Sequence, residues 1–166
     1  MRVALVFSDK ESLRQQIVAQ LKADYALLLR AAKTAHSAAT HEECVPDNKY
    51  ATLGLEASYI AQGQANRAQD ILRAQQRLQR MVLEKFSAET PIRLSAVVEL
   101  VDDEEQKRHV FIAPAAGGLE LDFASVRVMV ITPVSPLGRL LIGKRCGDLV
   151  ELTTNVVREY EIIAVY

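Results

Sequence analysis

The chain has 166 residues, a formal net charge of −1 and a pI near 6.3. This near balance of charge disfavours bulk attraction to nucleic acid or to an anionic membrane surface, so independent DNA binding is not expected. Cys44 and Cys146 are too few and too far apart to form a disulfide framework. No segment reaches the length of about 18 apolar residues that a membrane span needs, and the opening residues lack the features of a signal peptide. Composition therefore predicts a cytoplasmic protein without a membrane anchor.

The first predicted element is a long helix that begins near Ser8. Ser8 and Glu11 have the spacing of a capping box, in which each side chain satisfies a free backbone N–H at the helix start. Apolar residues then recur at helical spacing from Leu13 to Ala35, and no Gly or Pro interrupts the pattern before Pro46. The pattern indicates one helix of about thirty residues.

A second helical pattern follows Tyr50, runs from Leu53 to Val82, and is expected to end before Thr90 and Pro91. At about 1.5 Å per residue each helix would extend for about 45 to 50 Å, which is longer than a small domain is wide. The connection between them, residues 41–49, is short and contains a proline. We therefore expect residues 1–90 to form an antiparallel coiled-coil hairpin with its tip at 41–49.

Three acidic residues lie in this tip: Glu42, Glu43 and Asp47. Clustered carboxylates offer the hard oxygen ligands that Mg²⁺ prefers, but acids and proline are equally typical of a solvated turn. The neighbouring His41 and Cys44 match no established zinc spacing. From chemistry alone, the solvated turn is the stronger interpretation.

The second half of the chain, residues 91–166, changes to short apolar runs that are rich in Val, Ile and Leu and separated by turn signals. The expected strands are 94–100, 109–113, 126–132, 149–153 and 159–165. Between the third and fourth runs, Ser135 has the character of a helix N-cap, with Pro136 in the first turn and Gly143 at the end. This half predicts a twisted antiparallel sheet with one short helix, which makes the whole chain an α+β protein.

One long motif in this half is more specific than the rest. Residues 131–148 read ITPVSPLGRLLIGKRCGD, and Val150-Glu151-Leu152 and Tyr160-Glu161-Ile162 follow them. The motif closely resembles the C-terminal domain of the bacterial Gre transcript cleavage factors, which has an FKBP-like fold. The resemblance extends to the architecture, because Gre factors carry an N-terminal antiparallel coiled coil with acids at its tip.

The resemblance implies a function as well as a fold. In Gre factors the C-terminal domain docks at the rim of the RNA polymerase secondary channel, and the tip acids help to hold a second Mg²⁺ that activates water for cleavage of backtracked RNA. Carried over by position, Glu43 matches the first tip acid, and Ser135, Leu137 and Arg139 lie in the segment near the polymerase contact. The chain would then be a monomeric accessory to the polymerase, with Mg²⁺ shared rather than its own, and would contact nascent RNA only indirectly.

The sequence departs from the Gre pattern at one place, because Pro46 stands where the family carries its second tip acid. Asp47 or Glu42 would have to replace that carboxylate, which leaves two alternatives: a cleavage factor, or a Gre-like modulator that occupies the channel without cleavage. A prolyl isomerase of FKBP type is disfavoured because it needs an aromatic-lined pocket. A structural coiled-coil module would not explain acids at the tip of the hairpin.

Overall fold

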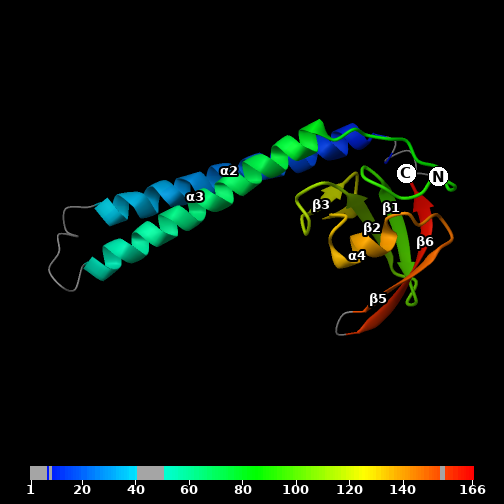
Figure 1. The fold of residues 1–166 in the computed structure, drawn as a ribbon. Helices are drawn as coiled ribbons and strands as arrows, with labels where there is room; N and C mark the ends of the chain where they lie inside the picture. The colour runs from blue at the N-terminus through cyan, green and yellow to red at the C-terminus, as the bar shows by residue number, and fades with distance from the viewer. Residues whose placement is uncertain (1–6, 8, 41–50, 154–155) are drawn as a thin grey trace. The chain divides into compact units, whose positions relative to one another are not determined.

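The computed structural model describes residues 7, 9–40, 51–153 and 156–166, which form two compact units (Figure 1). One unit is Val18–Gln76, and the other combines Met1–Ile17 with Arg77–Tyr166. The sequence placed a single boundary between residues 90 and 91, whereas these units assign the base of each helix to the sheet-containing half. No helix in the described ranges is long and apolar enough to cross a membrane.

Both long helices are present, as α2 (Lys10–Thr40) and α3 (Ala51–Arg80), and they pack as a hairpin in the unit Val18–Gln76 (Figure 1). The buried side chains of this unit recur at helical spacing along one side of each helix, as the apolar pattern predicts. They are Val18, Leu21, Ala32, Ala68 and Gln75. The antiparallel hairpin expected from the two patterns is therefore confirmed.

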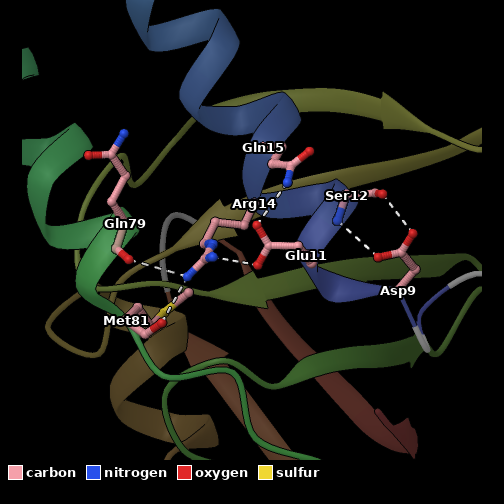
Figure 2. Close-up of polar contacts among 7 residues, drawn as sticks. All are labelled: Asp9, Glu11, Ser12, Arg14, Gln15, Gln79 and Met81. Carbon is pink, nitrogen blue, oxygen red and sulfur yellow. Dashed lines mark hydrogen bonds and ion pairs between the residues drawn. The ribbon is translucent and has the colours of Figure 1, made fainter.

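The first turn of α2 differs in detail from the predicted capping box. Asp9 caps the helix, because its carboxylate accepts from the backbone N–H of Ser12 at 3.0 Å and from the Ser12 hydroxyl at 2.6 Å (Figure 2). Ser8 lies outside the described residues. Glu11 does not turn back towards the cap but contacts Arg14 and accepts from the side chain of Gln15 at 2.9 Å. A carboxylate that stands beside an arginine one turn away has a better partner than a backbone N–H.

The second half forms one six-stranded sheet in the order β3-β4-β2-β1-β6-β5. The strands are β1 (Val97–Asp102), β2 (Lys107–Ile112), β3 (Glu120–Phe123), β4 (Val126–Ile131), β5 (Leu149–Thr153) and β6 (Val157–Val165). The expectation of a purely antiparallel sheet is wrong at one pair, because β2 and β4 run parallel from His109↔Val128 to Ile112↔Ile131. The loop 113–119 carries the chain past β4 to the sheet edge, so β3 runs back along that edge and β4 returns in the direction of β2.

Strand β3 was absent from the sequence prediction. It is only four residues long, and its turn to β4 consists of Ala124 and Ser125 at φ values of 49° and 69°. A two-residue hairpin with positive φ at both positions normally carries Asn-Gly or Asp-Gly, so the usual turn signal is missing here. The paired register Phe123↔Val126 then fixes β3 against β4.

The two faces of the sheet are buried by different parts of the chain. On one face, Val98, Val110 and Ile131 form a core with Leu141 of the short helix α4 (Pro136–Leu141). Side chains of the opposite face are equally buried although α4 cannot reach them, since alternate residues of a strand point to opposite sides. They are Val97, Phe111, Val128 and Val130.

The bases of α2 and α3, which are residues 10–17 and 77–80, cover this second face. Phe7, Leu13, Ile17 and Leu78 are at most 1% exposed. The Phe7 ring lies 5.4 Å from the ring of His109 and 5.4 Å from that of Tyr166, measured between centroids. The side chain of Gln16 donates to the Asp122 carbonyl in β3 at 3.0 Å. Phe7, to which the sequence assigned no role, thus contributes to the core.

Candidate partner-binding site

The segment singled out for docking is built around the N-terminus of α4. The Ser135 hydroxyl accepts from the Gly138 N–H at 3.1 Å and donates to the Thr132 carbonyl at 2.8 Å, which confirms the predicted N-cap. A Cβ atom on Gly138 would lie 2.0 Å from the Thr132 carbonyl oxygen, so no larger residue fits without a backbone shift. Ser135 and Gly138 therefore hold the turn, and the Ser135 hydroxyl is already engaged within it.

Leu137 and Arg139 are two positions apart on α4, so they do not share a helix face. Leu137 packs against the core cluster, while Arg139 is exposed. Leu137 also reaches the wall of a pocket of about 210 Å³ that opens on the surface. The pocket is lined by Lys107, Arg108, His109, Val110, Glu120, Arg127, Met129 and Leu137. Of the three predicted contact residues, only Leu137 belongs to this concave surface.

The pocket has an apolar floor and a predominantly cationic rim. Val110, Met129 and Leu137 supply apolar atoms, while three of the lining residues are Lys or Arg and one is Glu. Strand pairing brings them together, because Val110 in β2 lies directly opposite Met129 in β4. An apolar cavity with cations at its edge suits an apolar side chain of a partner that also carries acidic groups.

Ion pairs fix the orientation of two rim cations. Lys107 Nζ lies 3.0 Å from a carboxylate oxygen of Glu99, which is itself buried. Arg127 is more exposed and lies 3.5 Å from Asp122 and 3.9 Å from Glu120. Because the Lys107 ammonium group is paired with the buried Glu99 carboxylate, Arg127 is the more available of the two cations.

Glu99 is the centre of a small polar network on the sheet face opposite the Val110 and Met129 side chains. It accepts from the Tyr166 hydroxyl at 3.1 Å and lies 3.8 Å from His109 Nε2. Burial lowers the pKa of His109 below its ordinary value, outweighing the nearby Glu99 carboxylate, so the imidazole stays neutral at pH 7. Burial and the same carboxylate raise the pKa of the Tyr166 hydroxyl to about 12. Lys107 closes the network from its outer side, 3.0 Å from the Glu99 carboxylate.

The acidic tip residues Glu42, Glu43 and Asp47 lie outside the described residues, as does Pro46. In the ranges that the structure does describe, no three His, Cys, Asp or Glu side chains gather closely enough to hold a metal ion. The predicted shared Mg²⁺ site therefore remains a prediction.

Sequence reasoning missed most of the pocket. Lys107, Arg108 and Arg127 come from two strands that pair in parallel, and an antiparallel sheet would not have placed them together. The one available signal was the run Lys107-Arg108-His109 at the start of an apolar strand, where charged residues indicate an exposed end.

The fold and the pocket together define a two-helix hairpin protein with a sheet domain suited to binding a partner. Residues 87–166 match the family described as "Transcription elongation factor, GreA/GreB, C-term". Residues 87–166 therefore form a domain of the GreA/GreB transcription elongation factor family.

Two relatives show how far the likeness extends. The GreA factor of Rickettsia prowazekii is 36% identical over 75 residues, which span 45% of this chain and 43% of the relative. The chain thus matches less than half the length of that protein. The GreA factor of Chelativorans sp. is 26% identical over 167 residues, covering 99% of this chain and 97% of its own. Among solved structures, GreA factor homolog 1 of Thermus thermophilus is 23% identical over 92% of this chain and 94% of its own, with a TM-score of 0.40.

Proposed function

We propose that this chain binds bacterial RNA polymerase at the secondary channel and regulates transcript elongation. The observation that carries the proposal is the Gre-type C-terminal domain at residues 87–166, joined to a long two-helix hairpin. In this proposal the sheet domain docks at the channel rim, and the hairpin directs residues 41–49 towards the active centre, where contact with nascent RNA is indirect.

The pocket beside α4 supports a specific mode of docking. Leu137 and Met129 offer apolar contact area, and Arg127 stands at the rim for acidic groups of the polymerase. Arg139 lies away from this pocket, so its contribution is the smaller one. The pocket lining contains no Phe, Tyr or Trp, which does not favour a prolyl isomerase.

At the tip, Glu43 and Asp47, with Glu42 beside them, would add carboxylate ligands to a Mg²⁺ ion held mainly by the polymerase, a donor set that suits this ion. Bound there, the ion would activate water for hydrolysis of backtracked RNA. Pro46 in the sequence favours a second candidate function, in which the hairpin occupies the channel without supporting cleavage.

One experiment with two readouts tests the proposal. Purified core polymerase should bind the chain, a known channel occupant should compete for that binding, and Leu137→Ser should weaken it about tenfold by removing apolar contact. Arg139→Ala serves as the control and should change binding by less than about threefold. Absence of binding, or binding indifferent to the competitor, contradicts the proposal.

The second readout separates the two candidate functions. A backtracked elongation complex should release short 3′ fragments faster when the chain is added, and Glu43→Ala and Asp47→Ala should each reduce the acceleration without reducing binding. Unchanged cleavage in the presence of bound wild-type chain assigns the channel-occupying function instead.

A further inference from the structure

The end of α3 contradicts the helical pattern in the sequence. Apolar spacing predicts that the helix continues through Val82, but α3 ends at Arg80 and the following residues run without regular structure. Met81 remains buried, whereas Val82 is 74% exposed. Conflicts between local pattern and observed structure concentrate at functional sites, which makes this segment a candidate for one.

Side chains from the base of α2 and from the turn before β1 hold the extended segment in place. Arg14 donates to the carbonyls of Gln79 at 3.3 Å and Met81 at 3.0 Å, as Figure 2 shows. Lys10 Nζ donates to the Glu84 carbonyl at 2.5 Å. The backbone carbonyl groups at and just after the end of the helix thus accept hydrogen bonds from Arg14 and Lys10. This arrangement resembles the capping of a helix C-terminus by basic side chains.

The other side of the segment is fixed as firmly. Lys10 Nζ also donates to the Ser95 carbonyl at 3.0 Å, and the Ser95 hydroxyl accepts from the Glu84 N–H at 2.9 Å. The Lys10 ammonium group lies 4.4 Å from the centre of the Phe86 ring. Because this frame fixes the backbone on both sides of Val82, the exposed valine is held in place before any partner arrives.

Val82 lies in a shallow groove of about 410 Å³. The groove is lined by Arg77, Arg80, Met81, Val82, Glu84, Leu94 and Pro114. Leu94 is 40% exposed, so the groove holds two apolar side chains that face solvent. It shares no lining residue with the pocket beside α4 and is therefore a separate surface.

The charges around the groove indicate the kind of partner that it fits. Arg77 and Arg80 are both exposed, and their charges exceed the partial negative charge at the C-terminus of α3. Glu84 is the one acid in the lining, and it forms an ion pair with Arg93 at 2.5 Å. The groove is therefore apolar at its centre and cationic at the side of α3.

We infer that this groove binds an acidic peptide segment of a protein partner, which seats an apolar side chain against Val82 and Leu94 while its carboxylates meet Arg77 and Arg80. The inference concerns a second surface and does not depend on docking through α4. An acidic partner is favoured over a basic one because a Lys or Arg in the groove would face two like charges.

Selection of a random-peptide display library on the immobilised full chain tests the inference. Enriched peptides should combine Asp or Glu with Leu, Ile, Val or Phe. A synthetic copy of the most enriched peptide should bind wild-type chain in a fluorescence polarisation assay. Val82→Ser should weaken its binding about tenfold, since most of the apolar contact of one side chain is lost. Arg80→Gln should weaken binding several-fold, and so should a rise in salt concentration, which screens exposed charges.

Val157→Ser is the matched control, because Val157 is 58% exposed but lies in β6, outside the groove lining. It should leave peptide binding unchanged. Equal thermal unfolding midpoints would show that all three variants keep the fold. The inference is overturned if no peptide is enriched, if enriched peptides are basic, or if Val82→Ser binds them as well as Val157→Ser does.

Discussion

At the scale of single residues, Lys10 illustrates how a buried cation can organise this fold. It is 7% exposed, and its ammonium group contacts the carbonyls of Glu84 and Ser95 and the ring of Phe86. Burial lowers its pKa to about 8 despite the opposing effect of the Glu84 carboxylate. The sequence predicted the start of a helix at this point but gave no sign that a lysine there would be enclosed.

The lowered pKa gives stability a defined pH dependence. Between about pH 8 and pH 10.5 the unfolded chain keeps the Lys10 proton while the folded chain loses it, so the Lys10 contribution to stability rises with pH. In urea unfolding, Lys10→Met should be less stable than wild type at pH 7 by about 1–3 kcal/mol, because two carbonyls lose their donor.

The deficit of Lys10→Met should then widen by about 1 kcal/mol from pH 8 to pH 10, an amount reduced for solvent screening. Comparing the two proteins at each pH cancels the titration of Tyr166 and other shared groups. A deficit that stays constant or shrinks over this range would show that Lys10 is not desolvated in the folded state.

At the scale of elements, the helix hairpin contains a polar residue where its pattern calls for an apolar one. Gln75 is 8% exposed in α3, and its Nε2 atom has no hydrogen-bond partner among the described residues. A buried amide without a partner costs more than the apolar side chain that would replace it. A polar residue at the interface between two paired helices can select one register of the pair at some cost in stability.

Replacing Gln75 by Leu should therefore stabilise the protein by about 1–2 kcal/mol, measured by chemical denaturation. Gln76→Leu is the matched control, because the adjacent Gln76 is exposed and should change stability by less than about 0.5 kcal/mol. A loss of stability in Gln75→Leu would mean that the amide has a partner in solution.

At the scale of the whole molecule, the sheet unit is completed by residues distant from it in sequence. Val97, Phe111, Val128 and Val130 are fully buried on the face that α4 does not cover. Residues 7–17 and 77–81 supply the apolar side chains available to bury them. The unit that should fold on its own is accordingly 1–17 with 77–166, and not 91–166.

A chain in which a short Gly/Ser linker joins Ile17 to Arg77 tests this division. Arg14 contacts the Gln79 carbonyl, so the two ends are close enough for such a linker to span. The linked chain should unfold in one cooperative transition with dispersed NMR signals. The fragment 91–166 should lack them, because each large side chain removed from the core forfeits about 1.5–3 kcal/mol. Equal stability of the two would place the boundary near residue 90.

The sequence alone determined the two long helices, the N-cap at Ser135, five of the six strands and the Gre resemblance. These features depend on contacts between residues near one another in the chain, such as apolar spacing, caps and alternation. The resemblance in residues 131–148 likewise depends on an ordered motif that is visible without coordinates.

Tertiary structure decided the rest. The parallel pairing of β2 with β4 created the cationic pocket. Contacts of Arg14 and Lys10 coincide with the early end of α3 and hold Val82 in solvent. Each outcome depends on groups that are distant in sequence and meet only in the folded chain. The structure departs from the local sequence pattern where long-range hydrogen bonds and burial contribute more free energy than local preference does.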